Sequence, residues 1–167
     1  MRTTIVILSI VLLLASNNSV GQDRDKKLVA KLLIDAGVEF GGDEILQVFF
    51  TNGGDQTINA GQGGYISAGG HFEFPGFEPL SIRASVGFKF TTTAADNANI
   101  RFTRIPIILI PYFNYKDFRL GIGITSHQGV KLFGDGFVSD LDFTSSIGPR
   151  MELGYKWIAV TYTILNY

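Results

Sequence analysis

Cysteine is absent from this chain of 167 residues. Its absence excludes a disulfide-stapled fold and a lipid anchor attached to a cysteine behind a signal peptide. An excess of either charge is lacking too. The 14 basic and 15 acidic residues leave a formal net charge of −1, and no basic stripe indicates binding to nucleic acid. The length and the 46% share of hydrophobic residues fit one domain.

The apolar run at the N-terminus, residues 5–15, is short. A membrane-spanning helix needs roughly 17–25 apolar residues, so an uncleaved anchor is the weaker of two alternatives. Arg2 precedes the run, and the small residues Ser19 and Gly21 follow it. This pattern predicts a secretory signal peptide over residues 1–21, and a short charged leader over residues 22–30 then precedes the folded domain.

Helical periodicity is absent from the rest of the chain, and strict alternation takes its place. In residues 80–91 every even position is apolar, and every odd position is polar, charged or glycine. A period of two is that of a β-strand whose two faces meet different environments. The same phase recurs in residues 32–40, 65–74, 118–125 and 143–153. The sequence therefore predicts an all-β meander of antiparallel strands.

Turn signals divide these alternating segments. Asn52-Gly53-Gly54-Asp55 predicts the tip of a long first hairpin with arms at residues 31–51 and 56–74, because these residues tolerate positive φ. Further along, short breaks alternate with longer loops: the breaks lie at 75–79, 114–117 and 155–156, and the loops at 92–99 and 132–140.

The strand at residues 100–113 has an irregular phase. Ile100 and Phe102 continue the even apolar face, but Arg104 would then join that face. We expect a bulge near Thr103 and Arg104, or the prolines Pro106 and Pro111, to absorb the difference.

Alternation alone does not say which face is buried. The polar face is rich in glycine, serine and threonine, which suit a crowded interior better than a solvated surface. Aromatic residues gather near the strand ends, as expected at the two interfaces of a membrane. They are Phe72, Phe74, Tyr112, Phe118, Tyr155 and Trp157 near the short turns, and Phe40, Phe88, Phe90, Phe102 and Phe143 near the longer loops. The alternative is a secreted soluble β-sandwich or lipocalin-like barrel.

Charges of both signs share the polar face and are expected to pair with one another. A barrel of about eight strands is just wide enough to be filled by its side chains, so these charges predict an interior network rather than an open pore. The network is expected to contain Asp35, Glu39, His71, Glu73, Arg83, Lys89, Arg101, Arg119, Arg150 and Glu152.

His127 is the residue that an enzymatic alternative would need. A lipid-modifying hydrolase requires a histidine base beside a serine, but Ser126 is adjacent in sequence and so points to the opposite face of a strand. Lipid A deacylases place the serine two residues after the histidine, where this chain has Gly129. Gly134-Asp135-Gly136 lacks the spacing of a defined calcium loop, and no zinc cluster is present, so no metal or cofactor is expected.

Residues 31–167 resemble the small outer-membrane β-barrel proteins of Gram-negative bacteria, such as the OmpX, OmpW and OmpA transmembrane-domain groups. The resemblance depends on the signal peptide, the dyad repeats, the alternating connections and the terminal Tyr167. It implies an antiparallel up-and-down transmembrane β-barrel with a filled polar lumen, exported to the outer membrane.

The same resemblance implies a periplasmic leader at residues 22–30, contact with outer-membrane lipid and insertion by the barrel-assembly machinery. The implied role is structural or interactive through extracellular loops, non-enzymatic, with no ligand named by the sequence. The alternatives are a lipid-modifying outer-membrane hydrolase and a narrow, porin-like channel or carrier for small hydrophobic molecules.

The strand count contains a conflict. Counting the first hairpin as two strands gives seven, with residues 157–167 as the last, whereas single-chain bacterial barrels have even counts. Splitting the first arm at Gly41-Gly42 gives eight, but leaves residues 45–51 as a very short spanning strand. We therefore predict seven strands, with no closing eighth strand in this chain and with unpaired edges on the first and last strands.

Overall fold

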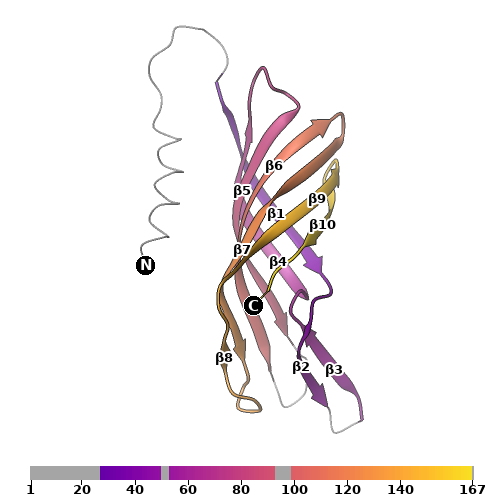
Figure 1. The fold of residues 1–167 in the computed structure, drawn as a ribbon, viewed down its shortest axis with the longest axis vertical. Coiled ribbons are helices and arrows are strands. Elements are labelled where there is room, and N and C mark those ends of the chain that lie inside the picture. The colour runs from indigo at the N-terminus through magenta and orange to yellow at the C-terminus, as the bar shows by residue number, and fades with distance from the viewer. Residues whose placement is uncertain (1–26, 50–52, 93–98, 167) are drawn as a thin grey trace.

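The computed structural model describes residues 27–49, 53–92 and 99–166, and these contain strands but no helix (Figure 1). The predicted signal peptide therefore lies outside the described residues. The strands are β1 (Val29–Glu39), β2 (Glu44–Phe49), β3 (Asp55–Asn59), β4 (Gly63–Glu73), β5 (Leu80–Thr92), β6 (Arg101–Tyr115), β7 (Phe118–Phe133), β8 (Leu141–Asp142), β9 (Ser146–Tyr155) and β10 (Ile158–Thr163). Among these residues no helix is long and apolar enough to cross a membrane.

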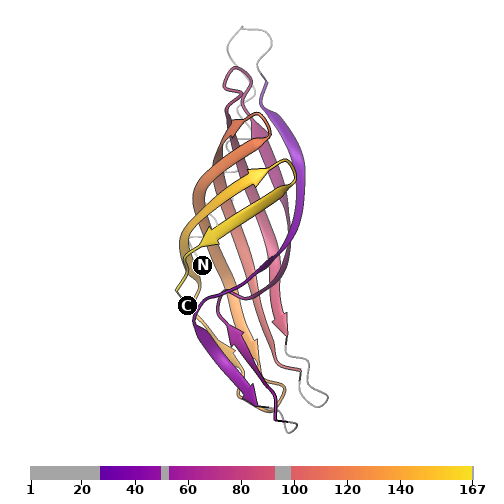
Figure 2. The ribbon, with the colours of Figure 1, turned by 90° about the vertical axis from the view of Figure 1, so that its right-hand side faces the viewer.

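Seven long strands form one antiparallel sheet in the order β1-β4-β5-β6-β7-β9-β10, which confirms the predicted meander. β8 pairs with the end of β7, and β2 and β3 form a separate two-stranded sheet. The large sheet curls around its own concave face (Figure 2). Its two edges, β1 and β10, pair with no further strand among the described residues, so the sheet is curled and open.

The connections are sorted by length between the two ends of the sheet. The β4–β5, β6–β7 and β9–β10 turns lie at one end, here called the short-turn rim, where β1 also begins (Figure 1). β2, β3 and β8, the end of β5, the start of β6 and the end of β7 lie at the other end, the loop rim. The predicted alternation of short and long connections is thus present.

The first hairpin is interrupted in both arms. β1 ends at Glu39, and Gly41 and Gly42 then adopt positive φ values of 93° and 87°, which break the strand before β2. β2 pairs only with β3, so it does not cross the sheet as a separate eighth strand. β1 begins at Val29, inside the predicted leader, and the predicted hairpin tip lies partly outside the described residues.

A bulge lies beside Arg104, as predicted, but the extra residue is on β7. Thr103 pairs with Lys131 and Ile105 pairs with Gln128, so β7 carries one residue more than β6 in this interval. Gly129, with φ of +55°, sits at this place and provides the left-handed conformation that such a bulge requires.

The prediction of which face β6 presents was wrong. Phe102 (0% exposed) and Tyr112 (2%) are buried on the concave face, although both were predicted to belong to the aromatic residues at the membrane interfaces. Arg104 is buried on the same face. The physical reason is that β6 is apolar on both sides between Ile105 and Phe113, so its alternation does not define a phase. The concave face is consequently not wholly polar: Ile108, Ile110 and Tyr112 form an apolar stripe on it.

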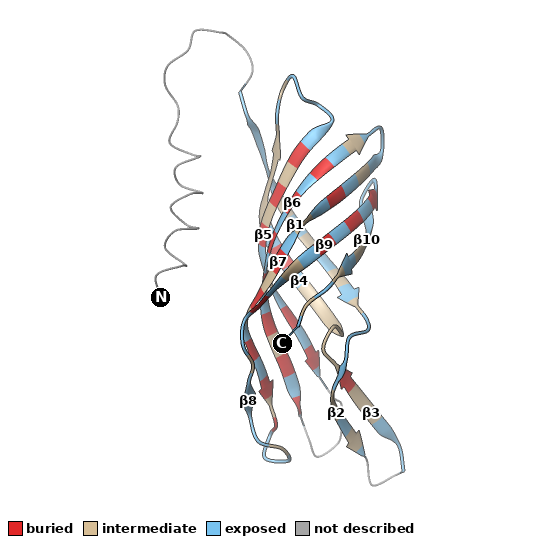
Figure 3. Ribbon diagram, in the orientation of Figure 1, coloured by how far each residue is buried: buried red, intermediate tan, exposed pale blue. Residues whose placement is uncertain are grey.

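The two faces of the curled sheet have inverted polarity. Large apolar side chains are exposed on the convex face, for example Ile34 (67%), Val86 (53%) and Ile122 (58%). Charged side chains are buried on the concave face, where Lys89 and Glu152 are each 2% exposed. Figure 3 shows the resulting alternation of buried and exposed residues along β5, β6, β7 and β9.

At the loop rim the burial is reversed, and apolar side chains are enclosed between the large sheet and the β2–β3 hairpin. Ile58 of the β2–β3 hairpin packs in one buried cluster with residues from the loop-rim ends of β6 and β7. The buried members of this loop-rim core are Ile58, Ile100, Phe102, Val130 and Leu132. The Gly129 bulge makes this reversal possible, because it turns Val130 and Leu132 inward beyond it.

Candidate functional site: the charged interior of the sheet

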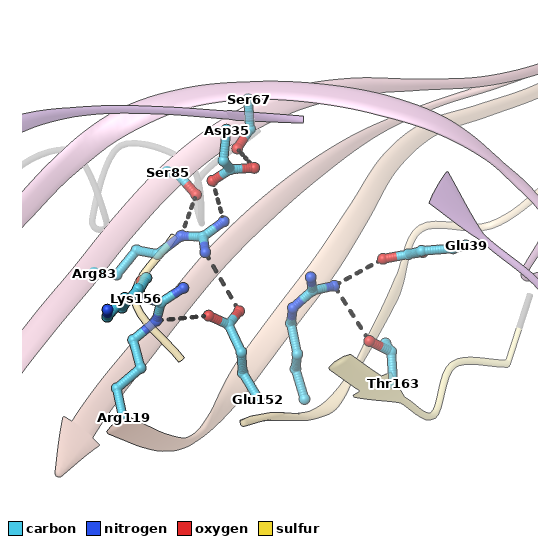
Figure 4. A network of polar contacts seen from close by, with 10 residues as sticks. Asp35, Glu39, Ser67, Arg83, Ser85, Arg119, Glu152, Lys156 and Thr163 are labelled. Atoms are coloured by element: carbon cyan, nitrogen blue, oxygen red, sulfur yellow. Dashed lines mark hydrogen bonds and ion pairs between the residues drawn. The ribbon is translucent and has the colours of Figure 1, made fainter. Parts of the chain in front are cut away.

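A chain of alternating charges crosses the concave face (Figure 4). Asp35 of β1 accepts a hydrogen bond from Ser67 Oγ (2.8 Å) and pairs with Arg83 of β5. Arg83 Nη1 in turn donates to Glu152 Oε2 of β9 at 3.3 Å. Arg119 Nε of β7 donates to Glu152 Oε1 at 3.4 Å.

This neutral chain, Asp35–Arg83–Glu152–Arg119, balances two carboxylates against two guanidinium groups. Its members come from four strands. Arg119 and Glu152 lie on the paired strands β7 and β9, whereas Arg83 of β5 reaches Glu152 of β9 because the sheet curls. The side chains of Arg83 (8% exposed) and Glu152 (1%) are the most enclosed. A buried charge is tolerated only when it is paired and hydrogen-bonded, and both side chains meet this condition.

A second group of charges, here called the cationic cluster, lies toward the loop rim. Glu39 pairs with both Lys89 and Arg150. Lys89 Nζ also donates to the carbonyl of Gly61 at 2.6 Å, and Arg104 donates to the carbonyls of Ala60 and Gln62. Two of the three cationic side chains, Lys89 and Arg150, thus share the carboxylate of Glu39, and Arg104 lies beside them. Backbone carbonyls from the bend between β3 and β4 and the hydroxyls of Thr91 and Thr163 supply further acceptors.

Arg150 is the member of the cluster that reaches both edges of the sheet. Its Nη1 donates to Glu39 Oε1 of β1 at 3.0 Å and to Thr163 Oγ1 of β10 at 3.3 Å. Figure 4 labels the two acceptors, Glu39 and Thr163. Its Nε and Nη2 are buried and have no hydrogen-bond partner among the described residues. Arg150 itself is 2% exposed.

The other residues of the predicted network lie apart from these two groups. Lys31 pairs with Glu73 at 2.6 Å and His71 Nε2 lies 3.7 Å from the same carboxylate, both at the short-turn rim in a more exposed setting. Arg101 is exposed at the loop rim, where its guanidinium lies 5.6 Å from the centroid of the Phe133 ring.

Sequence reasoning missed Arg104 as a member of the interior. The sequence did contain an indication of this position. Ile100, Phe102 and Arg104 are alternate residues and share one face of the strand, so an inward Arg104 meant that the two apolar residues also face inward. The apolar residues on both sides of β6 concealed that phase.

The structure places Ser126 and His127 on opposite faces of β7, as neighbours in a strand must be. His127 is 3% exposed on the concave face. Ser126 Oγ donates to the carbonyl of Ser146 at 3.0 Å and accepts from Gln128 Nε2 at 2.6 Å. A serine hydrolase pair of adjacent residues is therefore not formed here. Among the described residues no group of three or more His, Cys, Asp or Glu side chains is placed to hold a metal ion.

Comparisons of the chain with protein-family models, with curated proteins and with solved structures find no match. Function is therefore inferred from the polarity of the two faces and from the charges that the concave face encloses.

Proposed function

We propose that the curled sheet is the transmembrane part of an outer-membrane β-barrel protein. Its role is structural or interactive, through the segments at the loop rim, and non-enzymatic. The observation that carries the proposal is the inverted polarity of the sheet. Apolar residues from all seven long strands are exposed on the convex face, whereas Arg83, Lys89, Arg150 and Glu152 are buried on the concave face.

Water does not favour this arrangement, but a bilayer does. Contiguous apolar patches of more than a few hundred Å² are rare on soluble monomers, because exposed apolar surface is unfavourable in water. In hydrocarbon the same surface costs nothing, and the polar groups are stable only when enclosed. Six of the strands have 10 to 16 residues, enough for the roughly 9–11 residues with which a tilted strand crosses a bilayer.

Exposed aromatic side chains lie toward both ends of the apolar surface. Phe113, Tyr115, Phe118, Tyr155 and Trp157 are exposed near the short-turn rim, and Phe40, Phe88 and Phe90 are exposed nearer the loop rim. Aromatic side chains prefer the interfaces between lipid and water. Their placement supports a bilayer whose normal follows the long axis of the sheet.

The loop rim supplies the surface for interaction. Its apolar core is buried beneath the β2–β3 hairpin, which fits a segment that projects beyond the membrane. Such long connections are extracellular in outer-membrane barrels, whereas the short turns are periplasmic.

Membrane fractionation combined with heat-dependent gel mobility tests the proposal. The expressed protein is expected in the fraction that resists alkaline extraction, with a mobility that changes on boiling. Recovery in the soluble fraction, with one mobility at all temperatures, would contradict it.

A channel is disfavoured by the same interior, because paired charges and the apolar stripe of β6 fill the concave face. Planar-bilayer recordings of the refolded protein are expected to show no sustained single-channel conductance. Stable openings would instead favour the narrow channel.

A further inference from the structure

We propose that the seam between β1 and β10 takes up one additional β-strand from another polypeptide, antiparallel to both edges and with an acidic side chain facing Arg150. This inference rests on the proposed membrane location. It goes beyond that proposal by naming a partner segment and its chemistry.

The two edge strands of the sheet run in the same direction, which favours an added strand over direct closure. The seven long strands form an antiparallel meander, and an odd number of such strands leaves the first and last running the same way. β1 and β10 both run from the short-turn rim toward the loop rim (Figures 1 and 2). Direct closure would need a parallel pair, whereas every pair in the sheet is antiparallel. One strand running from the loop rim to the short-turn rim would be antiparallel to both edges.

The free sides of both edge strands have backbone groups that need hydrogen-bond partners. β1 pairs only with β4 and β10 pairs only with β9 among the described residues. Each edge thus presents a row of N–H and C=O groups on its free side. Lipid cannot hydrogen-bond these groups, so a sheet edge within hydrocarbon must be paired or covered.

The side chains beside the seam are mainly positive, which favours an acidic residue on the added strand. Arg150 contacts Glu39 on one edge and Thr163 on the other, and its Nε and Nη2 have no partner among the described residues. Lys89 and Arg104 add further positive charge, and the ion pairs that Lys89 and Arg150 form with described residues are both with Glu39. A carboxylate facing inward from an added strand would bind the remaining guanidinium N–H groups and reduce the excess positive charge.

The edge directions and the cationic cluster also limit which segment could occupy the seam. A second copy in the same membrane orientation offers edges with the same direction, so it would pair in parallel, and it would bring the same cationic cluster. The occupant assigned to the seam is a segment of a different polypeptide, about ten residues long. Its outward positions are apolar, and its inward positions are small and polar with one Asp or Glu.

The test uses the full chain folded in micelles and a fluorescent ten-residue peptide with alternating valine and threonine. One inward threonine is replaced by Glu in the first peptide and by Gln in the second. A third peptide carries the Glu one position along, on the outward face. We expect the first peptide to bind about tenfold or more tightly than the other two, as a charge-assisted pair provides. In Arg150→Gln the advantage of Glu over Gln should disappear.

Disulfide trapping tests whether β1 and β10 are in direct contact. The chain has no cysteine of its own, so every disulfide must come from the introduced residues. Ala36 and Val160 are exposed, and each lies three residues before the edge residue that Arg150 contacts. In Ala36→Cys/Val160→Cys, direct closure would form an intramolecular disulfide, which needs a Cα separation below about 7 Å. A seam with room for one strand separates the edges by roughly 9–10 Å, so no such disulfide is expected.

Each outcome bears on the proposal. Tight binding of the inward Glu peptide, its dependence on Arg150 and no spontaneous disulfide support it. A rapid intramolecular disulfide, a disulfide-linked dimer of two copies, or equal binding of the three peptides would overturn it. If the protein is membrane-inserted and heat-modifiable yet binds no peptide, the partner strand is refuted while the proposed function stands. If the protein is not in the membrane fraction, the proposed function itself has failed.

Discussion

At the scale of single residues, Glu152 is the most enclosed acid of the neutral chain. Its carboxylate is 1% exposed and accepts hydrogen bonds from Arg83 and Arg119. Lys31 and Glu73 also form an ion pair, but it is accessible to solvent, with side chains that are 57% and 40% exposed. The two carboxylates therefore form a matched comparison of buried and exposed pairing.

We predict that Glu152→Gln lowers the free energy of unfolding by about 3 kcal/mol, because breaking a buried pair leaves an uncompensated charge. The value should fall at the low end of the usual range, since Arg83 keeps Asp35 as a partner. Glu73→Gln should cost less than about 1 kcal/mol. Urea titration in detergent micelles measures both changes, and equal effects would contradict the buried network.

Close approach of the β6 backbone explains the glycine at position 123 of β7. A Cβ atom at Gly123 would lie 2.2 Å from the carbonyl oxygen of Leu109, whereas one at Gly64 would meet nothing within 4 Å. We predict that Gly123→Ala lowers the free energy of unfolding by about 1–3 kcal/mol, because a filled interior resists added volume. Gly64→Ala should be nearly neutral. The same titration distinguishes them, and two neutral variants would show that β6 and β7 do not pack this closely.

At the scale of the strands, the Gly129 bulge decides which side chains of β7 form the loop-rim core. The space near its Cα is open, since a Cβ there would come no closer than 3.7 Å to Ile105. A substitution should act through the positive φ alone.

We predict that Gly129→Ala lowers the free energy of unfolding by about 1–2 kcal/mol, and that Gly129→Asn costs less, because asparagine tolerates the left-handed region better. Thermal unfolding of the two variants gives the comparison. Asparagine and alanine with identical effects would argue against a left-handed bulge at this position.

The strands also show what the sequence could and could not predict. Alternation placed Asp35, Arg83 and Glu152 on one face, since their strands carry opposite kinds of residue on the two sides. It failed for β6, which is apolar on both sides, and so it misplaced Phe102 and Tyr112. Alternation also gives no pairings: Arg83 and Glu152 are 69 residues apart and meet only because the sheet curls.

At the scale of the whole molecule, the convex surface should respond to charge according to depth in the bilayer. Val86 lies in the middle of β5 and Leu80 at its short-turn end, and both are about half exposed on the convex face. In water, arginine would be tolerated equally well at both positions.

We predict that Val86→Arg reduces the folding free energy into liposomes by about 2–4 kcal/mol, whereas Leu80→Arg costs about 0–1 kcal/mol near the interface. Equilibrium folding into liposomes across a urea series measures both. Equal tolerance of the two arginines would remove the assignment of the convex face to lipid.

Spin-label accessibility tests the membrane location most directly. Single cysteines at Leu80, Val86 and Glu44 in the cysteine-free chain would carry a nitroxide, and collisions with oxygen, which enters lipid, would be compared with those of a water-soluble nickel chelate. The proposed location predicts the highest ratio of oxygen to nickel collisions at Val86, an intermediate ratio at Leu80 and the lowest at Glu44 on the β2–β3 hairpin. Nickel accessibility at Val86 as high as at Glu44 would contradict it.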